Sequence, residues 1–139
     1  MRAIESEKAP KAIGPYSQAA EAGGWIFVSG QIGMDPSGAM ADGVAGQTER
    51  CLANLAAILE SAGGLSRVVK TTVYMTDLSQ FAAMNEAYAR HFAPPFPARA
   101  TLQVAALPKG ALVEIEAVAA KGWRRARTLA FQSIQMYNK

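Results

Sequence analysis

The chain has 139 residues, of which half are apolar and 8% are aromatic. A chain of this length and composition is expected to form a single domain whose core needs neither a disulfide nor a structural metal. It contains no run of about 18 uncharged apolar residues, which excludes a membrane-spanning helix. One cysteine, Cys51, has no partner for an internal disulfide, and one histidine, His91, leaves a metal site short of ligands. Charged residues interrupt the first eight positions, which favours a cytoplasmic protein over one with a signal peptide.

The positive net charge of +3 belongs to the C-terminal end of the chain. Residues 121–139 hold five basic residues and no acidic one, whereas residues 1–120 hold 9 basic and 11 acidic residues. A slightly acidic body lacks the broad basic surface that phosphate binding requires. The charge distribution therefore argues against nucleic acid as a partner.

The hydrophobic periods predict strands and helices in alternation. Residues 17–22 and 25–31 flank Gly23-Gly24 and indicate a β-hairpin. Apolar residues at helical spacing predict a helix over 43–62, which Asp42 is expected to cap and Gly63-Gly64 to end.

A strand over 67–77 follows, with Val69, Thr71, Val73 and Met75 on one face. A second helix, which Ser79 is expected to cap, is predicted to run to about His91, with an apolar stripe of Phe81, Met84 and Tyr88. Two further strands are predicted over 98–105 and 112–120. This order favours one α+β domain with two helices on one face of a sheet, and the uncovered face predicts self-association.

Polar side chains on the last two strands are the candidates for chemistry. Arg99, Thr101 and Gln103 share one face of their strand, and Glu114 and Glu116 share one face of theirs. If the two strands are neighbours, an Arg and a Glu converge on one pocket, where the Arg suits a planar carboxylate and the Glu suits proton transfer to or from water. Spacing alone favours a simpler interpretation, a structural Arg–Glu ion pair on a solvated sheet face.

Several segments together resemble the RidA/YjgF family, also called the L-PSP or translation-inhibitor family. The resemblance runs from about residue 3 to residue 120, and five short motifs in the same order carry it. They are Ala12-Ile13-Gly14-Pro15-Tyr16-Ser17-Gln18, Val28-Ser29-Gly30-Gln31-Ile32, Val69-Lys70-Thr71-Thr72-Val73, Pro97-Ala98-Arg99, and Leu107-Pro108 with Glu114-Ile115-Glu116-Ala117. The resemblance implies a chorismate-mutase-like α+β fold, with a mixed sheet of about six strands and two helices on one face, assembled as a homotrimer.

The resemblance also implies an activity, the hydrolysis of reactive enamines and imines such as 2-aminoacrylate to 2-keto acids and ammonia, without a cofactor. Carried over residue by residue, it makes Arg99 the ligand of the substrate carboxylate and Glu114 the residue that holds the attacking water. The substrate-binding residues that it implies, in a cleft between subunits, are Tyr16, Ser29, Gly30, Asn85, Arg99 and Thr101. Many family members carry a cysteine where Thr101 stands, so a role for that thiol does not transfer to this chain.

Simpler interpretations accompany these residues. Tyr16 follows a rigid Gly14-Pro15 turn and is as compatible with packing as with binding, and Ser29-Gly30 is compatible with a β-bulge. Cys51 is expected to be a buried apolar residue, and His91 to favour the end of its helix electrostatically.

Two other functions stay open beside the deaminase: an RNA-directed translation inhibitor or endoribonuclease, and a non-catalytic ligand-binding or chaperone trimer. Residues 121–139 are expected to be a basic extension outside the domain of residues 1–120.

Overall fold

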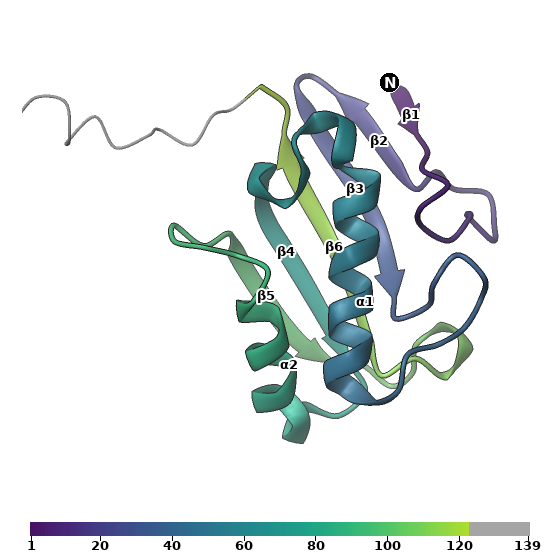
Figure 1. The fold of residues 1–139 in the computed structure, drawn as a ribbon, viewed down its shortest axis with the longest axis vertical. Helices are drawn as coiled ribbons and strands as arrows, with labels where there is room; N and C mark the ends of the chain where they lie inside the picture. Colours follow the sequence, from purple (N-terminus) through teal and green to yellow (C-terminus); the bar gives the residue numbers. More distant parts are fainter. Residues whose placement is uncertain (123–139) are drawn as a thin grey trace, which may run out of the picture.

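The computed structural model describes residues 1–122, which form one sheet with two α-helices on one face (Figure 1). The six strands are β1 (Arg2–Ile4), β2 (Ala19–Ala22), β3 (Trp25–Ile32), β4 (Val68–Met75), β5 (Ala98–Gln103) and β6 (Val113–Ala120). They lie in the order β1-β2-β3-β6-β4-β5. The β4–β5 pair is parallel and the other pairs are antiparallel. The predicted α+β class and mixed sheet are therefore confirmed.

The N-terminal hairpin forms where the two glycines predicted it. Ala22 of β2 pairs with Trp25 of β3, and the intervening Gly23 and Gly24 have φ values of 58° and 81°. Residues with side chains rarely adopt two successive positive φ values, so this tight turn depends on glycine. The sequence analysis missed the three-residue strand β1, which extends the hairpin by pairing with β2.

Helix α1 (Gly43–Ile58) supplies most of the helical side of the core. Its apolar face includes Leu52 and Leu55, both fully buried. The helix is shorter than predicted, because the chain tightens into a 3₁₀ turn at Glu60–Ala62 before Gly63 reverses it with a φ of 111°. Asp42 occupies the N-cap position, but its side chain makes no capping hydrogen bond.

Strand β4 differs from its predicted face at one position. Thr71, Val73 and Met75 are buried under the helices as expected, but Val69 is only half-buried. The pairing of β4 with β6 shifts register between Val68 and Lys70, and this irregularity turns Val68 into the core instead. A strict period of two cannot anticipate such a shift.

Helix α2 (Phe81–Ala89) begins one residue later than a cap at Ser79 predicts, and it ends before His91. A 3₁₀ turn at Leu78–Gln80 precedes it, and the carboxylate of Asp77, not the Ser79 hydroxyl, caps this turn by accepting a hydrogen bond from the Ser79 amide. Tyr88 is buried, whereas Phe81 at the other end of the helix is 40% exposed.

The face of the sheet opposite the helices carries no covering element within residues 1–122 (Figure 1). Trp25 and Phe27 of β3 point to this open face and are about half exposed. No helix in the described part of the chain is long and apolar enough to cross a membrane. The predicted basic extension lies outside the described residues from position 123 onward.

Candidate active site

Glu114 lies on the open face of the sheet, on the central strand β6. The alternation predicted for this strand is confirmed: Val113 and Ile115 are fully buried under the helices, and Glu114 and Glu116 point the other way. Partial burial raises the pKa of the Glu114 carboxyl, and the nearby Glu116 carboxylate raises it further. Glu116 itself accepts a hydrogen bond of 2.7 Å from the Tyr74 hydroxyl. Glu114 is therefore a carboxyl group that holds its proton more tightly than an exposed carboxyl group does, as a residue that transfers protons requires.

Gly30 makes room for the Glu114 carboxylate. The pairing of β3 with β6 shifts register between Val28 and Gln31, so Ser29 and Gly30 form an irregularity in the strand. A Cβ atom at Gly30 would lie 2.4 Å from Glu114 Oε1, which is closer than atoms tolerate. The hydroxyl of Ser29 donates to the Ser17 carbonyl at 2.6 Å. The Ser29-Gly30 pair thus fixes the backbone beside Glu114 and leaves space above it.

A pocket opens over Glu114, and its lining includes Tyr16, Gly30 and Gln31. Tyr16 is half exposed, and its hydroxyl accepts a hydrogen bond of 3.3 Å from the Ile13 amide. The structure therefore brings three of the expected site residues together: Tyr16, Gly30 and Glu114.

Arg99 lies on the other side of the sheet, on the edge strand β5. It pairs with the buried Thr71 of β4, and its guanidinium Cζ lies 4.8 Å from the ring centre of Tyr88. Phe81 lies 5.5 Å from the same atom. A second pocket is lined by Arg99 and Asn85 together with Tyr88, Phe96 and Pro97.

Thr101 lies two residues beyond Arg99 on the same face of β5. Its hydroxyl oxygen is buried and has no hydrogen-bond partner within residues 1–122. A buried hydroxyl without a partner is costly, so Thr101 marks a place where the single chain leaves a polar group unsatisfied.

Arg99 and Glu114 do not converge within one chain. The sequence analysis expected convergence if β5 and β6 were neighbours, but β4 lies between them. Arg99 shares the helix-covered face with Thr71, whereas Glu114 points to the open face. The alternative Arg–Glu ion pair is also absent from the described residues, in which Arg99 contacts aromatic rings but no carboxylate.

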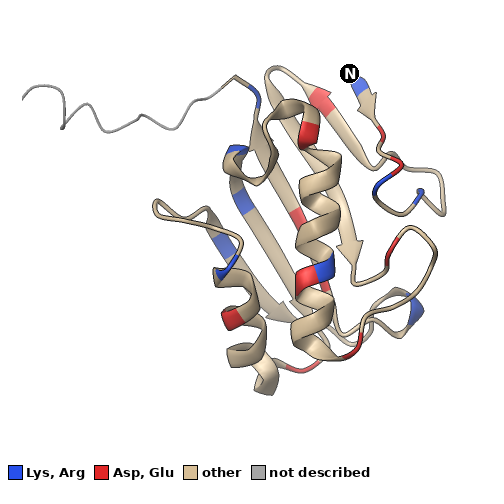
Figure 2. Ribbon diagram, viewed as in Figure 1, with Lys and Arg blue, Asp and Glu red and all other residues tan. Residues whose placement is uncertain are grey.

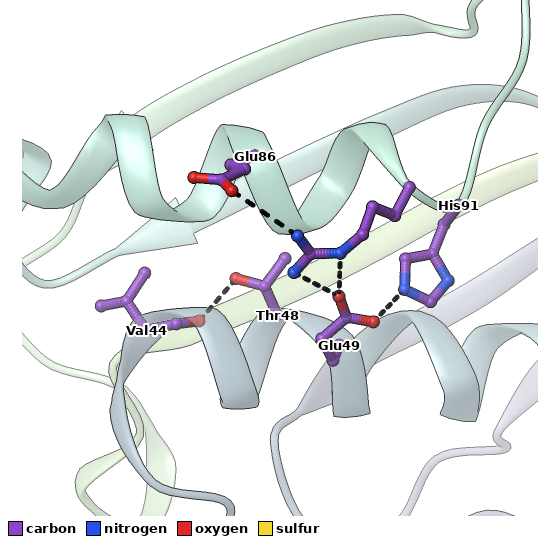
Figure 3. Close-up of polar contacts among 6 residues, drawn as sticks. Val44, Thr48, Glu49, Glu86 and His91 are labelled. Atoms are coloured by element: carbon purple, nitrogen blue, oxygen red, sulfur yellow. Dashed lines mark hydrogen bonds and ion pairs between the residues drawn. The ribbon is translucent and has the colours of Figure 1, made fainter.

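His91 lies beyond the end of α2 and forms an ion pair with Glu49 of α1 (Figure 3). Arg90 donates to the same carboxylate at 3.0 Å and lies 3.8 Å from Glu86. Hydrogen bonds from His91 and Arg90 lower the pKa of Glu49. These contacts tie α2 to α1 and are structural, away from both pockets.

Phe81 and Tyr88 were expected only as part of a packing stripe, and Phe96 was not among the expected site residues. No signal in the strand pattern placed an arginine against the rings of α2, since that contact depends on how the helix lies on the sheet. Phe96 carried a signal in its position beside the Pro97-Ala98-Arg99 motif.

A family model, curated proteins and solved structures all show similarity between this chain and one group of proteins. The model of the family described as endoribonuclease L-PSP matches residues 6–121. The chain is 52% identical over 124 residues to 2-iminobutanoate/2-iminopropanoate deaminase of Homo sapiens, with 87% of this chain and 90% of that protein covered.

Among solved structures, RidA from an Antarctic Psychrobacter species superposes with a TM-score of 0.83 at 47% identity, and covers 86% of this chain and 99% of its own. The YjgF gene product of E. coli gives a TM-score of 0.81 at 42% identity, with 87% of this chain and 99% of that chain covered.

Proposed function

The chain belongs to the endoribonuclease L-PSP family, and on that premise we propose that it hydrolyses reactive enamines and 2-imino acids, such as 2-aminoacrylate, to 2-keto acids and ammonia. Relatives named 2-iminobutanoate/2-iminopropanoate deaminase, at 48 to 52% identity, support this activity. The observation that carries it is a pair of complementary half-sites. One presents an arginine that has no carboxylate partner among the described residues 1–122, and the other presents a carboxyl group with a raised pKa.

Arg99 binds the carboxylate of the substrate in this proposal. The guanidinium offers a planar fork of N–H donors, which matches the two oxygens of a carboxylate. No carboxylate within residues 1–122 competes for these donors. Asn85 lies on the same side of the sheet and lines the same pocket as Arg99. Thr101 lies two residues beyond Arg99 on the same face of β5.

Glu114 holds the attacking water. The imine carbon is electrophilic, so hydrolysis needs an oriented water and proton transfer rather than a nucleophilic side chain. Water adds to the imine carbon, and one of its protons passes through the Glu114 carboxyl to the nitrogen. The remaining hydroxyl proton then passes to the nitrogen in the same way as the C–N bond breaks, so the carbonyl forms and ammonia leaves. General acid–base help of this kind contributes about 10²–10⁴ in rate. Tyr16, Ser29 and Gly30 form the surroundings of that carboxyl.

The two half-sites require a second copy of the chain to meet. They lie on opposite faces of one sheet, and the open face is uncovered and carries the exposed rings of Trp25 and Phe27. We propose a homotrimer of chorismate-mutase-like subunits in which Arg99 of one subunit faces Glu114 of the next. Light scattering is expected to give about three times 14.7 kDa. A fully active monomer would refute the shared cleft.

In this proposal the domain of residues 1–120 carries the activity without a cofactor, residues 121–139 are an appended basic extension, and the protein works in the cytoplasm.

An RNA-directed role is the second candidate, because the family description names an endoribonuclease. Charge argues against it. Acidic and basic residues are interspersed over the described chain (Figure 2), and residues 1–120 hold more acidic than basic residues. Binding through phosphates needs a basic surface, so we expect no salt-dependent RNA binding by a chain truncated after residue 122. Such binding would favour the RNA-directed role.

The activity is tested by generating imines in place. An amino-acid oxidase or a dehydratase supplies the imine, and semicarbazide traps what the protein does not hydrolyse. We expect the protein to suppress semicarbazone formation and to accelerate 2-keto acid release in proportion to its concentration. Comparing several coupled enzymes identifies the preferred side chain. Tight binding of a 2-keto acid without any acceleration would instead support a ligand-binding trimer.

A further inference from the structure

The guanidinium of Arg99 lies on an aromatic platform formed by α2. Its Cζ atom is 4.8 Å from the ring centre of Tyr88 and 5.5 Å from that of Phe81. Cations are attracted to the faces of aromatic rings within about 6 Å. A ring attracts the cation without pairing with it as a carboxylate does, and no carboxylate within residues 1–122 pairs with the Arg99 guanidinium. The contact therefore orients the arginine without consuming the donors that a carboxylate needs.

The Tyr88 ring is itself held on several sides. It is 5% exposed, and its centre lies 4.7 Å from the ring of Phe92. Its hydroxyl forms a buried hydrogen bond of 2.7 Å with the Thr71 hydroxyl. Thr71 is the β4 residue that pairs with Arg99 in the parallel register. The Tyr88 side chain therefore contacts the Arg99 guanidinium and is also hydrogen-bonded to Thr71, the residue that pairs with Arg99 on β4.

We infer that Tyr88 is a positioning residue for Arg99: its ring, fixed by the Thr71 hydroxyl, holds the Arg99 guanidinium where it receives the substrate carboxylate. This inference rests on the proposed function, because it assigns Tyr88 a role in binding a 2-imino acid. Tyr88 does not touch substrate in this account and acts only through Arg99.

The test compares three variants in the full-length protein. Tyr88→Leu removes the ring, Tyr88→Phe keeps the ring and loses the bond to Thr71, and Phe92→Leu disturbs the same buried cluster without contacting Arg99. All are assayed at a temperature at which circular dichroism shows them folded. Because a carboxylate ligand is held in ground and transition states alike, the expected defect lies mainly in KM rather than in kcat.

For Tyr88→Leu we expect a loss of roughly 2-fold to 30-fold in kcat/KM, which is the range that a cation–π contact supports. Inhibition by the product 2-oxobutanoate weakens by a similar factor. Tyr88→Phe restores most of the activity although it unfolds at a lower temperature than the unaltered protein. Phe92→Leu loses stability but not affinity. If Tyr88→Leu and Phe92→Leu have the same kcat/KM, Tyr88 is only a core residue and the inference is overturned.

A second measurement does not depend on activity. The Nε–H resonance of Arg99, identified by its absence in Arg99→Lys, is expected to show a ring-current shift that becomes smaller in Tyr88→Leu, in which only the more distant Phe81 ring remains. If the unaltered protein lacks this shift, the inference fails even if Tyr88→Leu does not fold. If the shift is present but no imine is hydrolysed, the proposed function fails, and 2-oxobutanoate binding by the variants then decides the role of Tyr88.

Discussion

Replacing Arg99 with lysine keeps the positive charge and removes the planar fork. The structure gives the arginine no carboxylate partner within residues 1–122, and its guanidinium lies beside the rings of Phe81 and Tyr88. Its donors are thus available to substrate. Lysine offers one compact ammonium group, so the substrate carboxylate loses a two-point contact and moves out of line with the water at Glu114.

We expect Arg99→Lys to lose about 2–4 kcal/mol of transition-state stabilisation, which is the range for a desolvated charge-assisted contact. This corresponds to roughly 30-fold to 1000-fold in kcat/KM. The free energy of unfolding should change by less than about 1 kcal/mol, because no ion pair is broken in the described chain and a partly exposed cation–π contact contributes little. The two effects differ by enough to be separated.

The assay measures 2-keto acid release and thermal unfolding on the same preparation. Arg2→Lys is a matched control, since Arg2 is an exposed arginine on β1 that forms an ion pair with Glu21 of β2. The control should retain its kcat/KM. An Arg99→Lys protein with unchanged kinetics would refute the carboxylate-binding role, and with it most of the argument for a deaminase over a binding protein.

Three further outcomes are expected. Glu114→Gln abolishes most deamination and raises the melting temperature near neutral pH. Because the pKa of Glu114 is raised in the folded state, the folded state loses stability as pH rises from the pKa of the unfolded chain, about 4.3, through the pKa of the folded protein. The gain in melting temperature of Glu114→Gln should therefore vanish at acid pH. Gly30→Ala pushes its Cβ against the Glu114 carboxylate, which must move away. We expect this variant to lose most of the activity but little stability, because the displaced atoms belong to a flexible side chain; a kcat/KM equal to that of the unaltered protein would contradict the close approach. Iodoacetamide leaves the native activity intact, because Cys51 is fully buried and burial raises the pKa of its thiol; stoichiometric labelling with loss of activity would show that Cys51 is accessible.

Much of the fold follows from periodicity in the sequence. The alternation in β6 predicted correctly which side chains enter the core, because this central strand pairs regularly with β4 along most of its length. The same reasoning failed at Val69, where a register shift turns Val68 inward, and at β1, since three residues give no detectable period. The start of α1 at Gly43 was predicted correctly, but its end and the start of α2 were misplaced because 3₁₀ turns adjoin them.

The candidate site was less accessible to sequence reasoning. The faces of β5 and β6 were each assigned correctly within the strand, but the order of strands in the sheet is not encoded in their periods. Only the topology shows that β4 separates them and that Arg99 and Glu114 point to opposite sides. The expected roles of Tyr16, Ser29, Gly30, Asn85 and Thr101 stay predictions, as does the cytoplasmic location.

The separation of the two half-sites on one sheet has a genetic consequence in the proposed trimer. Each subunit contributes Arg99 to one cleft and Glu114 to another, so a subunit damaged at one of these residues still completes its neighbour's cleft with the other. Two inactive alleles, one altered at Arg99 and one at Glu114, then complement each other when expressed together. For random assembly from equal amounts, about a quarter of the clefts in such a cyclic trimer receive both intact residues. A single chain that held both residues in one pocket would show no such complementation.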